Sequence, residues 1–166
     1  MMTQPRIYMA GPDVFMRDYA QHKAHIRQWC DALGLVALCP GDDEVKGESK
    51  AEVARRIYEV NIALIEPADY VVANVRDFRG HEPDSGTVFE IGYAVGRGKK
   101  VWCYNTPTQD LLHQIPQGEP GYCGEGMHIE DFGLPRNLML AGACTLVSAD
   151  LHTCLQQVAR WHAGQR

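Results

Sequence analysis

The stretch from Asp69 to Arg97 reads DYVVANVRDFRGHEPDSGTVFEIGYAVGR and combines a strand, a turn and a helix. Residues 69–75 are almost continuously apolar, as is typical of a strand that is buried on both faces of a parallel sheet. The residues that follow are rich in acids and glycine and include a proline, a composition that indicates a turn. From about 87 to 97, apolar residues recur at helical spacing. The stretch therefore predicts one β-α unit of a parallel sheet.

The same alternation of short apolar runs and amphipathic segments extends over the rest of the chain, with no internal repeat or linker. It predicts an α/β fold of the doubly wound class, with about five parallel strands and helices on both faces. We expect a single domain over residues 1–166. Between the fourth and fifth strands, residues 105–135 are rich in proline and glycine and predict a long irregular loop, a common form of a functional lid. The other expected strands are 7–10, 35–39, 101–104 and 145–147, and the other expected helices are about 18–33, 49–65 and 151–161.

Composition and charge exclude several classes of partner. The chain has 166 residues, 45% of them hydrophobic, and a formal net charge of −5 without any cluster of Lys and Arg. This argues against a nucleic-acid polymer, since such binding depends on neutralising phosphates. No apolar run approaches the roughly 20 residues that span a bilayer, and the first residues, MMTQPR, lack the pattern of a signal peptide. We therefore expect a cytoplasmic protein with no membrane partner.

The cysteines and histidines do not indicate a metal site. None of the six cysteines is spaced as CxxC, and several lie in apolar runs, so buried free thiols are expected rather than disulfides or zinc ligands. The histidines show no HxxxH or HExxH spacing. We expect neither a metal nor a cofactor.

A ligand site is expected where the strands end. Doubly wound sheets bind ligands beyond the carboxyl ends of their strands, at the point where the strand order reverses. Three segments should meet there: residues 11–15, residues 74–90 and the start of the long loop at Asn105.

Within these segments, Glu90 has two interpretations. Thr87-Val88-Phe89-Glu90 matches the capping box Ser/Thr-x-x-Glu, in which Glu90 would only cap a helix. Alternatively, the positive end of the helix dipole would keep the carboxylate ionised, and an ionised carboxylate can attack a sugar anomeric carbon. Asp84 is either a turn residue or an acceptor for a ligand hydroxyl, and Tyr8 is either a strand residue or a group that orients Glu90. His81 is expected to be solvated.

Three segments together resemble the nucleoside 2-deoxyribosyltransferase family. They are IYMAGPDVF at 7–15, FRGHEPDSGTVFEIG at 78–92 and FGLPRNLML at 132–140, and they occur in the family's order over almost the whole chain. The resemblance implies a flavodoxin-like fold. It also implies transfer of 2-deoxyribose from the nucleobase of a 2′-deoxynucleoside to a free nucleobase through a covalent deoxyribosyl-enzyme ester.

The resemblance also implies roles for individual residues. The nucleophile falls on Glu90, the tyrosine that hydrogen-bonds it on Tyr8, and the aspartate that holds the sugar 5′-hydroxyl on Asp84. Asn137 and Met139 match residues that a neighbouring subunit donates to the site, which implies a homo-oligomer, at least a dimer. The remaining substrate-binding wall is expected to include Gly11, Phe15, Phe78, Arg79 and Gly80.

One position departs from the family pattern. Some members carry an aspartate on the second helix that protonates the leaving base, and the nearest match here is Asn61, which cannot act as an acid. Either a purine takes its proton from solvent, or Asp77 or Asp13 serves instead.

Two other functions remain open at this point. One is an N-glycoside hydrolase of the same fold that acts on deoxynucleosides or their 5′-monophosphates. The other is a non-catalytic nucleotide-binding module in which Glu90 is only a cap. A carboxylate at Asp84 favours nucleosides over nucleotides, because it would repel a 5′-phosphate.

Overall fold

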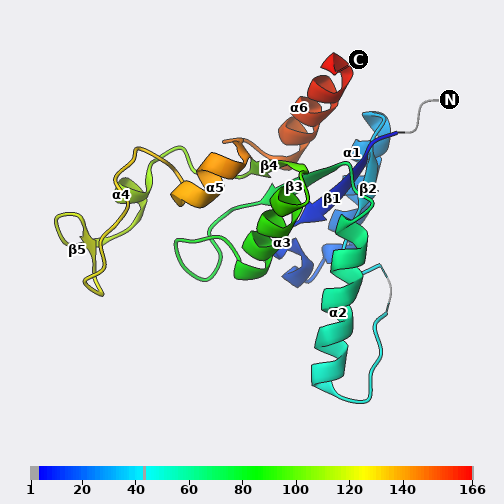
Figure 1. Cartoon of the computed structure of the whole chain (residues 1–166), viewed down its shortest axis with the longest axis horizontal. Coiled ribbons are helices and arrows are strands. Elements are labelled where there is room, and N and C mark those ends of the chain that lie inside the picture. Colours follow the sequence, from blue (N-terminus) through cyan, green and yellow to red (C-terminus); the bar gives the residue numbers. More distant parts are fainter. Residues whose placement is uncertain (1–3, 43, 166) are drawn as a thin grey trace.

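The protein is built around a parallel five-stranded sheet, seen here in a computed structural model that describes residues 4–42 and 44–165 (Figure 1). The strand order is β2-β1-β3-β4-β7, which is the flavodoxin-like order with its reversal point between β1 and β3. The doubly wound α/β fold predicted from the sequence is therefore confirmed. The strands are β1 (Arg6–Ala10), β2 (Val36–Leu38), β3 (Tyr70–Asn74), β4 (Lys100–Tyr104) and β7 (Thr145–Leu146).

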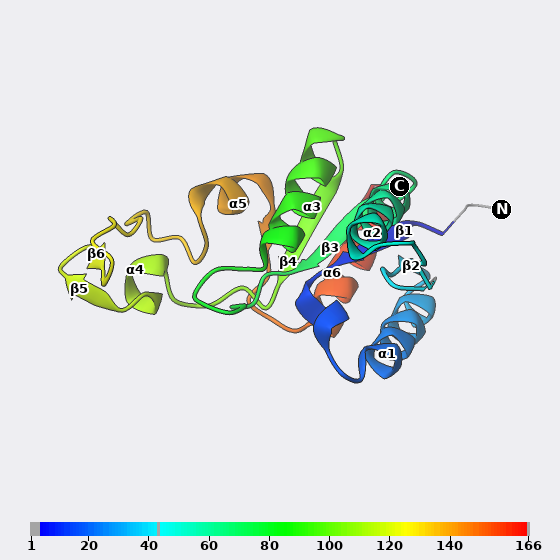
Figure 2. The same cartoon turned by 90° about the horizontal axis from the view of Figure 1, so that it is seen from below.

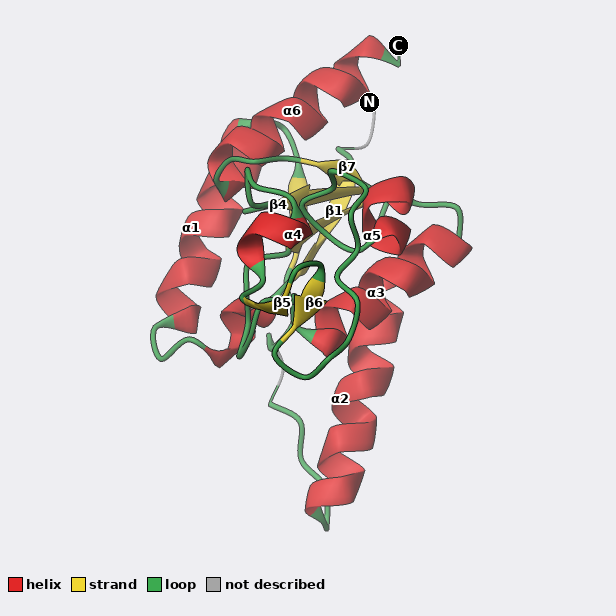
Figure 3. Cartoon of the chain, turned by 90° about the vertical axis from the view of Figure 1, so that its left-hand side faces the viewer, coloured by secondary structure: helices red, strands yellow, loops and turns green. Residues whose placement is uncertain are grey.

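Helices cover both faces of this sheet. Figure 3 shows α1 and α6 on one side and α2, α3 and α5 on the other. A short 3-10 helix, η1, follows β1 directly. The bounds are η1 (Pro12–Phe15), α1 (Tyr19–Ala32), α2 (Lys50–Ile65), α3 (Ser85–Gly96), α5 (Leu138–Ala143) and α6 (Leu151–Gly164).

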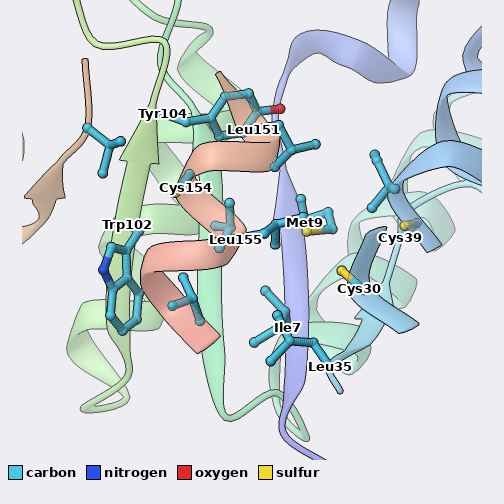
Figure 4. Close-up of a cluster of buried hydrophobic side chains, with 14 residues drawn as sticks. Ile7, Met9, Cys30, Leu35, Cys39, Trp102, Tyr104, Leu151, Cys154 and Leu155 are labelled. Carbon is cyan, nitrogen blue, oxygen red and sulfur yellow. The ribbon is translucent and has the colours of Figure 1, made fainter. Parts of the chain in front are cut away.

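Alternation along the strands divides the core into two layers. In β1, Ile7 and Met9 pack with α1 and α6, while Tyr8 and Ala10 pack on the side of α2 and α3. Figure 4 shows the first layer, in which Trp102 and Leu155 lie over the same face of the sheet. Because successive side chains of a strand point to opposite faces, the position of Tyr8 in β1 directs its ring toward α3.

Residues 105–137 leave the body of the protein as a long excursion (Figure 2). The expectation of an irregular loop here was wrong in part. The excursion contains α4 (Leu111–Gln114) and a small antiparallel pair, β5 (Gln117–Glu119) and β6 (Tyr122–Cys123). The sequence analysis also missed η1 and α5, which are too short to show a clear periodicity.

The state of the cysteines agrees with the expectation of free thiols. All six cysteines are free, and four of them, Cys30, Cys39, Cys103 and Cys154, are buried. Within 4–42 and 44–165, no helix is long and apolar enough to cross a membrane. Residues 1–3, part of the segment examined for a signal peptide, lie outside the described residues.

One buried arginine joins the excursion to the sheet. The side chain of Arg136 is 0% exposed. Its Nε and Nη2 donate to the carbonyl oxygen of Val75 at 2.9 and 2.6 Å, and its Nη1 donates to the carbonyl of His81 at 3.0 Å. Nη2 also pairs with Asp77 at 2.7 Å, and Nη1 reaches the side-chain oxygen of Gln114 at 3.2 Å. A buried guanidinium is tolerated because its donors are paired in this way.

We expect Arg136→Met to lower the free energy of unfolding by about 3 kcal/mol, because each buried carbonyl that loses its donor costs about 1–3 kcal/mol. Urea unfolding monitored by circular dichroism measures this change. The control is Arg160→Met on α6, where the exposed guanidinium donates to the nearby Gln156 carbonyl, and a change within about 0.5 kcal/mol is expected. A loss below about 1 kcal/mol for Arg136→Met would contradict a clamping role, since surface changes alone reach half that size.

Candidate functional site

A cavity of about 420 Å³ opens at the carboxyl end of β1. Its lining comes from the segment after β1, the connection between β2 and α2, helix α2 and the start of α3. The lining residues are Gly11, Val14, Phe15, Pro40, Gly41, Val45, Ile57, Val60, Asn61, Asp84, Gly86, Thr87 and Glu90. This is the reversal point of the strand order, where the fold places ligands. The cavity brings Glu90, Asp84, Gly11 and Phe15 together, as the sequence predicted.

Glu90 is the central carboxylate of this cavity. The hydroxyl of Tyr8, on the buried strand β1, donates to Glu90 Oε1 at 2.7 Å. The side-chain amide of Asn61, on α2, lies 3.4 Å from the same oxygen and can also donate to it. Burial raises the pKa of Tyr8 well above its usual range, and the nearby charge of Glu90 adds to this. Tyr8 therefore stays protonated and acts as a donor to the carboxylate.

The capping-box interpretation of Glu90 was wrong. Helix α3 begins at Ser85, and its N-cap is Asp84, whose side chain accepts the backbone N–H of Thr87 at 2.9 Å. Glu90 consequently lies in the second turn, beyond the reach of the helix's orphan N–H groups. Its side chain is free to project into the cavity.

The helix dipole does not dominate the ionisation of Glu90 either, because its effect fades after the first turn. Burial raises the pKa of Glu90 above its ordinary value. The hydrogen bond from Tyr8 opposes this shift, while the charge of Asp84 adds to it. The carboxylate is thus kept in a site that resists its ionisation, as is common for reacting groups.

Asp84 serves the helix and also borders the cavity. Its Oδ2 accepts from both the backbone N–H and the hydroxyl of Thr87, at 2.9 and 3.0 Å. Among the described residues, no donor is recorded for Oδ1. The structural interpretation of Asp84 as a turn residue is therefore refined to an N-cap, and its role toward a ligand hydroxyl stays a prediction.

The expected aromatic wall divides into two layers. Phe15 lines the cavity and is 60% exposed. Its ring stacks on Phe78, with centroids 5.5 Å apart, and the guanidinium of Arg79 lies 4.5 Å from the Phe78 ring centre. Neither Phe78, Arg79 nor Gly80 borders the Glu90 cavity. Phe78 contacts Phe15 instead, and the Arg79 guanidinium lies 5.5 Å from the Phe15 ring centre.

Asn137 and Met139 are not brought to Glu90 within the chain. Both lie at α5, beside a separate groove of about 650 Å³ between α5 and α3. Asn137 caps α5 by accepting the backbone N–H of Met139 at 3.0 Å, and Met139 is 73% exposed. Their predicted place in the site would therefore require a neighbouring copy.

The alternative acids proposed from the sequence do not reach the cavity. Asp77 pairs with Arg136, and Asp13 is bound by Asn74 and Tyr104. Among the described residues, the carboxyl groups that line the cavity are those of Asp84 and Glu90. The proposal that Asp77 or Asp13 protonates the leaving base is corrected accordingly.

Two apolar residues of α2 belong to the cavity and not to the core. Ile57 and Val60 have the helical spacing typical of core positions, but they line the cavity, and Ile65 is the buried residue of α2. Apolar spacing identifies the inward face of a helix. It does not show that α2 extends beyond the sheet (Figure 1), where Ile57 and Val60 line the cavity.

Comparison with known proteins agrees with this geometry. The family model for nucleoside 2-deoxyribosyltransferases matches residues 7–139, a range that includes the residues that line the cavity. The chain belongs to the nucleoside 2-deoxyribosyltransferase family.

Solved structures show the same fold. A 2-desoxiribosyltransferase from Leishmania mexicana matches with a TM-score of 0.81 and 30% identity, over 95% of this chain and 99% of that one. A 2-deoxyribosyltransferase from Bacillus psychrosaccharolyticus matches with a TM-score of 0.57 and 20% identity, over 91% and 90% of the two chains, which supports the fold alone.

A curated relative points to a different reaction. A protein of Thermofilum pendens that carries the name of a 2′-deoxynucleoside 5′-phosphate N-hydrolase is 34% identical over 100 residues, 58% of this chain. The match covers 64% of that relative, and a match to a Schizosaccharomyces pombe protein covers 50% of it at 26% identity. The chain thus spans about half to two thirds of the curated relatives it matches.

We expect Glu90→Gln to stabilise the protein at neutral pH. Because the pKa of Glu90 is raised on folding, the unfolded chain ionises this group first, and above about pH 4.3 that difference favours unfolding. Glutamine removes the penalty and keeps an oxygen for Tyr8. The melting temperature of Glu90→Gln should exceed that of the wild type at about pH 7.5 and converge with it near pH 4.

The control for this prediction is Glu59→Gln, on the exposed side of α2, where the carboxylate pairs with Arg55. The melting temperature of Glu59→Gln should not rise above that of the wild type by a comparable amount at any pH between about 4 and 7.5. A Glu90→Gln variant that melts below the wild type at neutral pH would show that the carboxylate is held favourably.

Proposed function

We propose that this protein transfers 2-deoxyribose between nucleobases, through an ester formed on Glu90. The observation that carries the proposal is the pairing of the Glu90 carboxylate with Tyr8 at the bottom of the cavity. Both recorded donors, Tyr8 and Asn61, bind Oε1, and among the described residues none is recorded for Oε2. Oε2 is therefore the oxygen that can attack.

The reaction consists of two displacements at the anomeric carbon. In the first, a lone pair of Glu90 Oε2 forms a bond to C1′ while the bond from C1′ to the base nitrogen breaks, and its electron pair leaves with the base. In the second, a ring nitrogen of another base attacks C1′ and releases the carboxylate. Both transition states have oxocarbenium character, which the adjacent carboxylate stabilises. The Tyr8 hydroxyl holds Oε1 and so orients the second oxygen.

The carboxylate of Asp84 supports nucleosides as substrates. It borders the cavity in the same turn of the chain that leads to Glu90, and its charge acts on Glu90. A neutral 5′-hydroxyl can donate to its Oδ1. A 5′-phosphate would instead place two negative charges beside two carboxylates, an unfavourable arrangement in a partly desolvated site.

Asn61 supports purines as leaving bases. Its amide borders the cavity beside Glu90, and it can hydrogen-bond a departing base but cannot give it a proton. The base must then take a proton from solvent. A purine can do so at N7 before its bond to C1′ breaks, so we place purine deoxynucleosides ahead of pyrimidine ones.

The second candidate function is hydrolysis of deoxynucleoside 5′-phosphates, which the name of the Thermofilum pendens relative favours. In that reaction, water replaces the acceptor base in the second displacement. The negative charge of Asp84 argues against this substrate here, because it would repel the 5′-phosphate. Both reactions share the first displacement. They differ in whether the sugar is then joined to another base or released by water, so the sugar product distinguishes the two functions.

We expect deoxyinosine and adenine to give deoxyadenosine and hypoxanthine, followed by liquid chromatography, with little free deoxyribose. Glu90→Ala should lower the rate by at least about 10³-fold, as loss of a covalent nucleophile does. Intact-mass measurement with deoxyinosine alone should detect a deoxyribosyl adduct that is absent in Glu90→Ala.

Equal release of deoxyribose with and without adenine, and no deoxyadenosine, would favour the hydrolase. A faster reaction with deoxyinosine 5′-monophosphate than with deoxyinosine would do the same. No adduct and no product with any substrate would leave a binding module, in which Glu90 has no chemical role.

We further propose that a neighbouring copy of the chain completes the site with Asn137 and Met139. Within one chain these residues lie at the groove between α3 and α5, away from Glu90. The same surface exposes Met139 and Leu138 and borders the apolar residues Val88, Val95 and Leu140. Exposed apolar surface next to an apolar groove is typical of an interface.

Mixing two inactive variants tests a shared site. Glu90→Ala and Asn137→Ser should each be impaired, and serine keeps an oxygen that can cap α5. Co-expressed as a dimer, they should regain about a quarter of the wild-type activity, because half the dimers are mixed and each of these has one intact site. Activity equal to the mean of the two separate variants would show that each chain builds its own site.

A further inference from the structure

We infer that Asp13 is a positioning residue of the Glu90 cavity, which it serves by fixing η1, and with it Phe15, against the end of β3. The inference rests on the proposed function. It concerns how the part of the cavity wall that carries Phe15 is held in place. Asp13 itself does not line the cavity.

The carboxylate of Asp13 is bound by two buried side chains from the sheet. The amide nitrogen of Asn74, the last residue of β3, donates to Oδ1 and Oδ2 at 3.0 Å each. The hydroxyl of Tyr104, at the end of β4, donates to Oδ2 at 3.1 Å. Asn74 and Tyr104 are almost fully buried. Burial raises the pKa of Tyr104 well above its usual range, so its hydroxyl remains a donor.

A second set of contacts fixes the orientation of Asn74. Its side-chain oxygen accepts from the amide nitrogen of Asn105 at 3.0 Å and from the backbone N–H of Arg76 at 3.2 Å. These two donors require the oxygen on that side, so the amide nitrogen must face Asp13. Asn105 adopts a φ of 54°, in the left-handed region that asparagine tolerates better than most residues. The anchor is thus built into the ends of β3 and β4.

The backbone at Gly11 approaches this anchor closely. A Cβ atom at Gly11 would lie 2.6 Å from Asp13 Oδ2 and 2.8 Å from the Cβ of Asn74. Any side chain there would push the carboxylate away from its donors. Gly11 also borders the cavity, so the anchor and the cavity wall meet at one residue.

The anchor determines the position of Phe15 because η1 is only four residues long. Phe15 lies two residues beyond Asp13 and lines the cavity, where an aromatic ring suits stacking of a nucleobase. Phe15 also stacks on Phe78, which follows β3. His22 on α1 also faces Asp13, with its Nε2 3.7 Å from Oδ1, within ion-pair distance but too far for a hydrogen bond. The side-chain hydrogen bonds recorded for Asp13 among the described residues therefore tie η1 to the ends of β3 and β4.

Loss of the anchor should weaken binding of the base more than it slows the attack by Glu90. For Asp13→Asn, we expect the KM for deoxyinosine to rise about 10-fold while kcat changes by less than about 3-fold, because ground-state contact with the wall is lost. Asp13→Ala should show a larger rise in KM. Amide hydrogen exchange, measured by mass spectrometry, should become faster over residues 11–16.

The matched control is Asp69→Asn. Asp69 Oδ2 accepts the backbone N–H of Arg6 at 2.7 Å. Like Asp13, it is an aspartate that holds a segment next to β1 by hydrogen bonding, but it acts at the end of β1 that lies away from the cavity. This variant should leave KM and the exchange of residues 11–16 unchanged. Asparagine keeps the side-chain shape of aspartate and one acceptor oxygen. If Asp13→Ala fails to fold, the wild type is therefore compared with Asp13→Asn alone.

Two results would overturn the inference. One is a KM within about 2-fold of the wild type in Asp13→Asn despite faster exchange over residues 11–16. The other is a fall in kcat above about 100-fold at unchanged KM, which would make Asp13 part of the chemistry. A wild type without base exchange or hydrolysis would refute the proposed function separately. The dissociation constants of wild type and Asp13→Asn for deoxyinosine, from calorimetry, would then decide the role of Asp13.

Discussion

The structure depends on the buried guanidinium of Arg136. This side chain donates hydrogen bonds to the carbonyl oxygens of Val75, just beyond β3, and of His81. These bonds fix the turn that leads to α3. Arg136 belongs to the excursion between β4 and β7, far along the chain from the turn it holds. An unpaired charge could not remain at this depth, so the excursion and the turn must be formed together. Glu90 and Asp84 acquire their positions from that turn.

The end of β3 is the common support of both walls of the cavity. On one side, the turn beyond β3 leads to Asp84 and Glu90. On the other, Asn74 holds Asp13, and Phe78 stacks on Phe15. Both walls are therefore positioned by the same strand, an arrangement that suits the proposed transfer, in which the sugar must stay fixed while bases exchange. The site also carries a cost, since burial opposes the ionisation of Glu90 and Tyr8 offsets only part of that effect.

Local patterns predicted the fold well, but the details of α3 were misjudged for a physical reason. Thr87 and Glu90 have capping-box spacing, yet Asp84 is three residues before Thr87 and caps the helix first. Two overlapping signals competed, and the tertiary position of the turn selected the earlier one. Likewise, Ile57 and Val60 have core spacing, and only the overhang of α2 beyond the sheet turns them into cavity wall. Asn137 and Met139 were predicted to belong to the site only through resemblance, because nothing in their own spacing relates them to Glu90.

The sequence alone predicted the strands of the parallel sheet, the longer helices α1, α2, α3 and α6, and the end of the sheet at which a ligand site is expected. The strands and helices follow from the spacing of apolar residues and from the turn residues between them, which are local signals. The position of the ligand site follows from the rule that ligands bind at the carboxyl ends of parallel strands, which depends on topology. Only the tertiary structure decided that Tyr8 and Asn61 share one oxygen of Glu90, and that Asp13 anchors η1 instead of serving as an acid. Those relations join residues 29 to 82 positions apart, and a hydrogen bond between distant residues leaves no periodicity in the chain.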